Sequence, residues 1–425
     1  MPDTPMGPVQ SGRTTYTRVV AAVRVIDARA PWLLQAVTIV LAVVLYGGRR
    51  PDQLSHPMVW AEETVILGKW LNGHAEALVD PVAGQSVLIS SWLVSLSGSI
   101  SVRYLPEVEL LMMTAVFFVT VILLVLPRSV WGPRWARCLM ALSLALVPIN
   151  PEPYMVLLFA FWWTSLWPLI ILGWHADRYW IRLPVLVLAG ISSLAAALAA
   201  PLFAALWIWR RQRRDLWSAI VLTPCLVLQV VVAETSDRQF PTLQVSTLLQ
   251  QVLHTFAVYF RDVPFSGRIQ NATHGDTIVA VALISGLVMA VLRLPTVRKR
   301  AAGTMLLCGL LGYALISAIP APLVTNPSGD GPRYYFLPFA LLGLLLFFLI
   351  ASTRDVVVRV LCIAIVLAGL LPLLHDYDRQ ADAVSWRQAI TACANSRDQT
   401  YALPVQSNGR ADALWILTVP TVRCR

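Results

Sequence analysis

The sequence has few charged residues and lacks the short motifs of soluble enzymes. Only 13% of its 425 residues are Asp, Glu, Lys or Arg, whereas a soluble domain carries about 25%. No CxxC, HExxH, GxSxG or Walker-type pattern occurs, which argues against a soluble catalytic domain. The chain also lacks segments of about ten residues with strict apolar and polar alternation, so it does not resemble a transmembrane β-barrel.

The chain is instead rich in long apolar segments. Of all residues, 57% are hydrophobic, and they gather in runs such as 110–126, 336–350 and 356–374. A helix needs roughly 20 mostly apolar residues to cross a hydrocarbon core of about 30 Å. Because lipid offers no hydrogen bonds to the backbone, such runs must be helical. The sequence therefore predicts an all-α fold, a polytopic transmembrane helix bundle.

The net charge of +10 and the pI near 9.6 come from arginines and lysines between the apolar blocks. These basic residues are Arg128, Arg134, Arg137, Arg178, Arg182, Arg210, Arg211, Arg213, Arg214, Arg293, Arg298, Lys299, Arg300, Arg354 and Arg359. Basic residues in short loops mark the cytoplasmic side of a membrane protein. The positive charge therefore indicates orientation in a membrane, and we expect no nucleic-acid partner.

The basic loops predict the topology. Residues 1–30 form a cytoplasmic tail, and 31–374 form the bundle with outer loops at 48–106, 234–276 and 320–334. We expect about eleven spans, near 31–47, 108–127, 137–149, 156–174, 183–199, 201–209, 216–233, 277–293, 302–319, 335–351 and 356–374. Residues 375–425 form a short extracytoplasmic tail. The first span has no small-residue cleavage site, so we interpret it as an uncleaved anchor in a multi-pass protein of the cell (inner) membrane.

The six cysteines fall into two groups. Four lie in or beside apolar helices, as small buried side chains do: Cys138, Cys225, Cys308 and Cys362. Cys393 and Cys424 lie in the predicted outer tail, where an oxidising compartment allows a disulfide. Their spacing does not show whether the geometry permits one, so both states stay open.

The first candidate site lies shortly after the first span. Trp60, Glu62 and Glu63 stand in an apolar stretch, and carboxylates at a membrane interface are costly unless they are paired or used. One of the two acids can act as a general base, with the other orienting an acceptor or a metal. The alternative is a solvated loop with two surface acids.

The second candidate site is a proline-rich outer turn at 148–154. It contains Glu152 and is followed by Trp162 and Trp163. If the bundle folds back on itself, Glu152 lies near Glu62 and Glu63. The alternative for the tryptophans is the aromatic belt at a membrane interface.

Two further candidates come later in the chain. A Gly/Pro-rich loop leads into Arg333, Tyr334 and Tyr335, where the planar arginine fork suits a phosphate; the alternative is an interface anchor. The outer loop 234–276 carries possible phosphate and substrate ligands and one apolar helical face. Its candidate ligands are His254, Tyr259, Arg261 and Arg268, and its apolar face comprises Leu248, Val252, Phe256, Tyr259 and Phe260.

These motifs together resemble the GT-C class of membrane glycosyltransferases, most closely its bacterial polytopic members. The Trp-Ala-Glu-Glu run at 60–63 is similar to the acidic motif of the first outer loop of that class. Glu152 before the tryptophans, the Ala-Ala-Pro break at 199–201 and the Arg-Tyr-Tyr run at 333–335 match later features. The acidic pair here is Glu-Glu, where the class more often includes Asp.

The resemblance implies transfer of a sugar from a polyprenyl-phosphate donor to a glycan, lipid or protein acceptor on the outer face of the membrane. We expect Glu62, Glu63 and Glu152 to be catalytic, Arg333, Arg261 and Arg268 to bind the donor phosphate, and Trp60, His254, Tyr259, Trp163, Tyr334 and Tyr335 to bind substrate. No nucleotide cofactor is expected, and use of a divalent cation stays open. Glu62 is preferred as the base.

Three other functions stay open at this stage. A lipid-linked glycan polymerase or ligase would depend more on Arg and His in one late outer loop. A flippase or transporter would show internal repeats and ionisable residues in mid-span, and the acids here gather at the outer ends instead. The last alternative is a structural membrane subunit.

Overall fold

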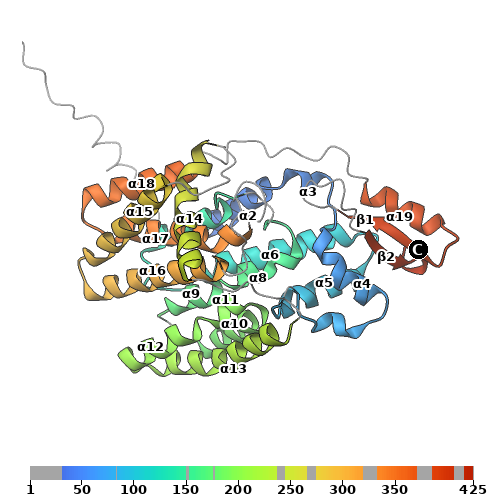
Figure 1. The fold of residues 1–425 in the computed structure, drawn as a ribbon, viewed down its shortest axis with the longest axis horizontal. Coiled ribbons are helices and arrows are strands. Elements are labelled where there is room, and N and C mark those ends of the chain that lie inside the picture. Colours follow the sequence, from blue (N-terminus) through green and yellow to red (C-terminus); the bar gives the residue numbers. More distant parts are fainter. Residues whose placement is uncertain are drawn as a thin grey trace, which may run out of the picture.

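The structure is a computed structural model, and it consists mostly of helices. The residues that it describes are 31–82, 84–149, 153–175, 178–236, 245–265, 274–318, 333–370, 385–405 and 416–424. The predicted all-α bundle is confirmed for the body of the chain (Figure 1). A small antiparallel pair of strands is added near the C-terminus.

Among the described residues, four helices are long and apolar enough to cross a membrane. They are α6 (Leu105–Val125), α13 (Arg213–Thr235), α16 (Val297–Ala318) and α17 (Arg333–Ser352). Each has at least 20 residues, the length that a hydrocarbon core requires. α17 is the most deeply buried of the four and packs against α16, α18 and α7. These helices indicate a membrane protein.

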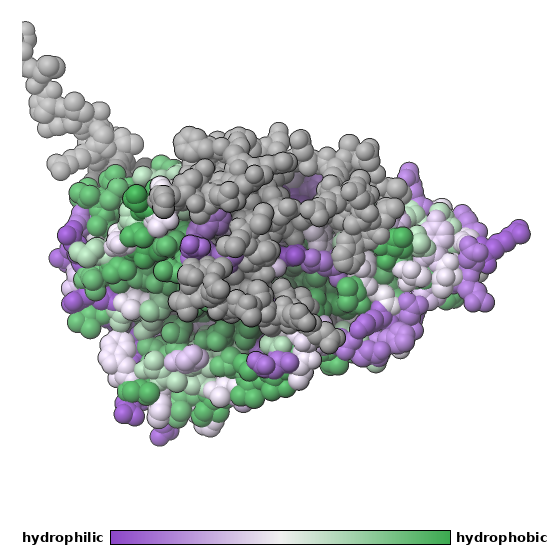
Figure 2. All heavy atoms as spheres, viewed as in Figure 1, coloured by the Kyte–Doolittle hydropathy of each residue, from purple (hydrophilic) through white to green (hydrophobic). Residues whose placement is uncertain are grey.

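The outer surface of the bundle is rich in exposed apolar side chains. Leu111, Val227 and Ile278 are more than half exposed, and they belong to three different helices. Figure 2 shows apolar residues spread over the helical body, whereas hydrophilic residues gather toward its two ends. A large contiguous apolar surface is unfavourable in water and marks a contact with lipid or protein.

The other helices of the body are shorter or less apolar than these four. They are α2 (Pro31–Gly48), α5 (Leu88–Ile100), α7 (Arg134–Ala145), α8 (Ala160–Thr164), α9 (Trp167–Leu172), α10 (Tyr179–Ser192), α11 (Leu194–Ala197), α12 (Ala200–Arg210), α14 (Val245–Phe265), α15 (His274–Leu292) and α18 (Val356–Leu370). The number of eleven spans therefore stays a prediction.

Two predicted spans are interrupted in the structure. The segment 156–174 consists of the 3₁₀ turn η3 (Leu157–Phe159), α8 and α9, and Pro168 in the first turn of α9 cannot donate a backbone hydrogen bond to a preceding turn. The segment 183–199 breaks at Ser193, whose extended backbone ends α10 and whose hydroxyl caps α11. An apolar run alone does not reveal such breaks, because the side chains remain apolar through them.

The predicted outer loop 234–276 contains a long helix, α14. The expected apolar face is present, since Phe256 and Tyr259 are buried and Val252 is partly buried. α14 packs against α15, α16 and α18. This segment is therefore part of the packed helical body.

The basic loops meet at one end of the bundle, which we call the basic end. The backbone N–H of Val130 donates to Gly173 (2.8 Å), and that of His175 donates to Arg128 (3.0 Å). The Arg214 guanidinium donates to the His175 carbonyl at 2.6 Å. Burial and the surrounding arginines hold the pKa of the His175 imidazole below its ordinary value. The predicted gathering of positive charge on one side is confirmed for these loops.

The opposite end, which we call the loop end, carries the first long loop and the C-terminal tail. The loop contains α3 (Pro51–Ser55), η1 (Ala61–Glu63), α4 (Thr64–Leu71) and η2 (Ala75–Leu78). The tail contains α19 (Trp386–Asn395), β1 (Thr400–Pro404), β2 (Ile416–Pro420) and η5 (Thr421–Arg423). β1 and β2 pair antiparallel, with Thr400 opposite Pro420.

The tail docks on the first loop through side chains (Figure 1). The Trp386 indole donates to the Val102 carbonyl at 3.1 Å, and the Asn72 amide donates to the Thr418 carbonyl at 3.3 Å. Two segments about 300 residues apart in sequence therefore form one layer at the loop end.

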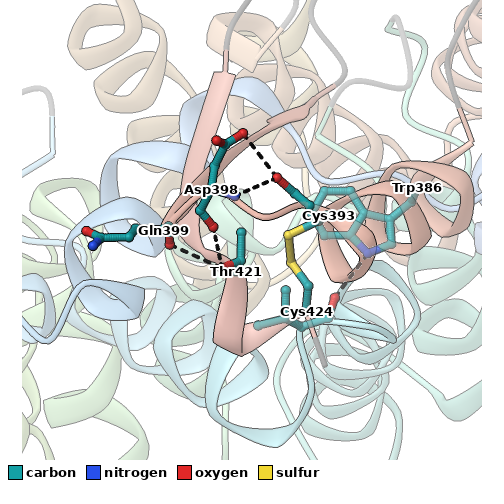
Figure 3. Close-up of a disulfide and its surroundings, with 8 residues drawn as sticks. Trp386, Cys393, Asp398, Gln399, Thr421 and Cys424 are labelled. Atoms are coloured by element: carbon teal, nitrogen blue, oxygen red, sulfur yellow. Dashed lines mark hydrogen bonds between the residues drawn. A yellow bond between two sulfur atoms is a disulfide. The ribbon is translucent and has the colours of Figure 1, made fainter.

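Cys393 and Cys424 form a disulfide, which links α19 to the end of the chain (Figure 3). Thr421 reinforces the link, because its hydroxyl donates to the Asp398 carbonyl at 2.8 Å. The disulfide that the sequence left open is therefore present. It joins α19 covalently to the segment that follows β2.

We predict that breaking this disulfide loosens the tail. A loop of this length (a sequence separation of 31) is stabilised by about 3 kcal/mol through a disulfide. Cys393→Ser with Cys424→Ser should therefore speed proteolytic cleavage between residues 385 and 425, measured by limited proteolysis and mass spectrometry in nanodiscs. Treating the wild type with a reductant should give the same pattern, and equal cleavage rates before and after reduction would contradict the prediction.

Candidate functional site

The centre of the candidate site is an ion pair between Glu62 and Arg333. The Arg333 guanidinium lies 2.7 Å from the Glu62 carboxylate, although 271 residues separate the two in sequence. Both side chains are partly exposed, Glu62 by 34% and Arg333 by 24%. The structure thus brings together the predicted base and the predicted phosphate ligand.

Glu63 holds the segment that presents Glu62. Its side chain is buried, and its carboxylate accepts the backbone N–H of Trp60 at 2.9 Å and of Leu158 at 2.9 Å. The first bond closes the 3₁₀ turn η1, and the second ties this turn to η3. Glu62, the residue before it, remains on the open side.

Glu63 forms a carboxyl pair with Glu109 of α6, a residue that is not among the sites predicted from the sequence. The two side chains share a hydrogen bond, which requires that one of them carries a proton. Burial raises the pKa of Glu63 to about 7, against the lowering effect of the Leu158 and Trp60 N–H groups. The Ser97 hydroxyl also lies 3.3 Å from Glu109. Glu109 could have been recognised in the sequence as an acidic residue near the start of an apolar span.

Five aromatic side chains form a connected group beside Arg333, which we call the aromatic frame: Trp60, Phe159, Phe161, Trp162 and Tyr334. The guanidinium lies 5.6 Å from the ring centres of both Phe159 and Tyr334. Trp60 contacts Phe159, and Trp162 contacts both Phe161 and Tyr334. Guanidinium groups are attracted to aromatic faces at such distances, so the frame holds Arg333 while leaving it partly open.

A second feature begins two residues after Arg333. Tyr335 is buried and lies 5.7 Å from Phe339, which in turn lies 5.0 Å from Tyr259. Tyr259 and Phe339 line an apolar cavity of about 220 Å³ between α7, α14, α17 and α18. The predicted substrate residue Tyr259 therefore lines this apolar space, and Tyr335 packs against Phe339 beside it.

Trp163 lies in a buried aromatic core. Its ring contacts Tyr46, Phe117 and Phe336, and its indole donates to the Pro153 carbonyl at 3.2 Å. This geometry gives Trp163 a supporting position beneath the 153–159 segment.

Four other predicted residues lie away from the ion pair or beyond the described part of the chain. His254 is partly buried on α14. Arg261 belongs to α14, but its side chain lies outside the described residues, as do Glu152 and Arg268. Their expected roles stay predictions. Within the described residues, no three His, Cys, Asp or Glu side chains gather as metal ligands.

No family model, no curated protein and no solved structure matches this chain. The function of the site can therefore be inferred only from its own geometry.

The Glu63–Glu109 pair yields a prediction about stability. In Glu63→Gln, the side-chain NH₂ group faces one of the two backbone N–H groups that the carboxylate accepts, so this N–H group loses its acceptor. An unsatisfied buried donor costs about 1–3 kcal/mol. Glu109→Gln still donates to Glu63 and should be nearly neutral. The measurement is the thermal unfolding midpoint of each variant in nanodiscs. Equal losses in the two variants would show that the carboxylate does not hold η1 to η3.

Proposed function

We propose that this protein is a membrane glycosyltransferase, which moves a sugar from a polyprenyl-phosphate donor to a glycan, lipid or protein acceptor. The single observation that carries the proposal is the partly open Glu62–Arg333 pair within the aromatic frame. The pair combines a carboxylate that can accept a proton with a cation that can bind phosphate.

Arg333 serves the donor phosphate. The donor is a phosphodiester with one negative charge, and its two unesterified oxygens match the planar guanidinium fork as a carboxylate does. A bound donor therefore competes with Glu62 for Arg333. The exchange leaves the Glu62 carboxylate without its cation at the moment when the donor is in place.

Glu62 then serves the acceptor. It takes the proton of the acceptor hydroxyl as the acceptor oxygen forms a bond to the anomeric carbon. The bond between that carbon and the phosphate oxygen breaks, and the polyprenyl phosphate leaves with its negative charge facing Arg333. Attack from the side opposite the phosphate inverts the anomeric configuration.

The apolar cavity serves the donor lipid. It lies beyond Tyr335 and Phe339, on the same helix as Arg333. In this proposal, the isoprene chain of a donor bound at Arg333 follows α17 to a lining that includes Leu142, Val366 and Phe347. Burial of apolar chain in such a space is favourable by about 0.8 kcal/mol for each CH₂ group.

The two ends of the bundle suggest the orientation. The basic end faces the cytoplasm by the positive-inside rule, and the disulfide of the tail fits an oxidising compartment. The loop end, with the Glu62–Arg333 pair, then faces the outside of the cell (inner) membrane.

We predict that transfer depends on the chemistry of Glu62 and not only on its charge pairing. Glu62→Gln should lower the rate by about 10²–10⁴-fold, the usual effect of losing a general base. Arg333→Lys should weaken donor use and Arg333→Ala should weaken it further. Sugar transfer is measured in nanodiscs with a radiolabelled polyprenyl-phosphate sugar.

Two controls separate catalysis from structure. Glu107→Gln breaks another ion pair at the same end, which Glu107 forms with Arg387 at 3.1 Å, and it should leave the rate unchanged. The double charge swap Glu62→Arg with Arg333→Glu restores an ion pair but should remain inactive. Recovery of transfer in the swap would mean that the pair is purely structural.

We also predict that filling the apolar cavity impairs use of long donors. Val366→Phe places a larger side chain in the cavity and should raise the KM for a long polyprenyl donor more than for a farnesyl donor. Val360→Phe is the matched control, because Val360 lies exposed on the same helix. An equal KM change for the two donors, or for the two variants, would place the lipid elsewhere.

A further inference from the structure

Two buried indole N–H groups at the candidate site have no hydrogen-bond partner among the residues that the structure describes. They are Nε1 of Trp60 and Nε1 of Trp162, in side chains exposed by only 5% and 7%. A buried donor without a partner costs about 1–3 kcal/mol, so native proteins rarely keep one without a reason.

Other buried indoles of the chain satisfy this group. Trp131, Trp163, Trp167, Trp174 and Trp386 donate to Ile170, Pro153, Thr120, Leu123 and Val102, respectively. Their partners are backbone carbonyls in four cases and a hydroxyl in one. The two exceptions therefore do not reflect a general looseness of indole packing.

Both exceptions belong to the aromatic frame around Arg333. Trp60 contacts Phe159 with ring centres 6.4 Å apart, and Trp162 contacts Tyr334 with ring centres 6.5 Å apart. Arg333 lies over both Phe159 and Tyr334. Each indole therefore contacts a different one of the two rings that lie against the guanidinium.

The chemistry of these groups defines what they bind. An indole N–H and a guanidinium only donate hydrogen bonds and accept none. The three groups together require a ligand rich in acceptor oxygens, such as a phosphate joined to a sugar. The flat faces of the tryptophans also suit the apolar face of a sugar ring.

We propose that Trp60 and Trp162 donate their indole N–H groups to oxygens of the phosphosugar headgroup of the donor, which Arg333 holds by its phosphate. This inference rests on the proposed function and deepens it. It makes Trp162 a ligand-binding residue, and it gives Trp60 a defined atom and role. The ligand supplies hydrogen-bond acceptors for the two indole N–H groups, which have none among the described residues.

The test removes the N–H group and keeps the shape of the ring. Trp60 and Trp162 are each replaced by 3-benzothienylalanine, in which sulfur stands in place of N–H. Binding of farnesyl phosphate and of a farnesyl phosphosugar is then measured in nanodiscs, together with the unfolding midpoint. The matched control is the same replacement at Trp174, whose N–H bonds Leu123 at 3.1 Å at the basic end.

We expect each replacement at the site to weaken binding about tenfold, which corresponds to about 1.4 kcal/mol, without lowering the unfolding midpoint. The control should lower the midpoint and leave binding unchanged. A loss for both ligands assigns the N–H groups to phosphate oxygens, and a loss for the phosphosugar alone assigns them to the sugar. Unchanged affinity for both ligands overturns the inference, as does a wild type that binds neither.

A second measurement covers variants that fail to fold. In wild-type protein with 5-fluorotryptophan, the fluorine resonances of Trp60 and Trp162, assigned by Trp→Phe variants, should shift with farnesyl phosphosugar, and unmoved resonances overturn the inference. Ligand binding without sugar transfer would refute the proposed function and leave the inference standing. Normal transfer after both replacements, combined with loss of transfer in Glu62→Gln, would refute the inference and leave the proposed function standing.

Discussion

The Glu63 carboxylate joins three segments that are far apart in the chain, and the geometry of the candidate site depends on it. It accepts backbone N–H groups from Trp60 and Leu158 and shares a hydrogen bond with Glu109. A carboxylate is stable in such a buried place only when its oxygens are occupied. Because η1 is fixed to η3 in this way, Glu62 stays at the open side and Phe159 lies beneath Arg333.

Hydrogen-bond donors and acceptors are distributed unequally around the Glu62–Arg333 pair. Among the described residues, the site combines the Glu62 carboxylate, which accepts hydrogen bonds, with three groups that only donate them: the Arg333 guanidinium and the buried indole N–H groups of Trp60 and Trp162. The Arg333 guanidinium donates to the Glu62 carboxylate. In the proposed function, an anionic ligand with many oxygens would satisfy these donors and free the carboxylate, so that binding of the donor would prepare the group that acts on the acceptor.

The rest of the fold separates two environments. Basic loops meet around His175 at one end, and the docked tail with its disulfide covers part of the other. The helices between them expose apolar side chains outward. Arg49, which lies at the loop end, does not contradict this charge pattern, because it is buried and its guanidinium bonds the carbonyls of Val147 and Ile149. Its role there is to hold the segment that leads to η3.

The sequence by itself determined the features that depend on composition and local order. The apolar runs specified helices, the basic residues specified one end of the bundle, and the apolar period of 248–260 specified the buried face of α14. The residues of the ion pair, Glu62 and Arg333, were also recognisable, since a charge at the edge of an apolar run is costly unless it is used.

Only the tertiary structure decided how these residues divide their roles. Glu62 and Glu63 are neighbours of the same type, and the sequence favoured Glu62 only by its place in the Trp-Ala-Glu-Glu run. One of the two N–H groups that hold Glu63 in its buried position belongs to Leu158 of η3, almost 100 residues later. Glu109, Trp162 and the disulfide partners are likewise defined by long-range contacts. Local sequence governs the free energy of a helix, whereas hydrogen-bond satisfaction in a buried site depends on groups that meet only after the chain has packed.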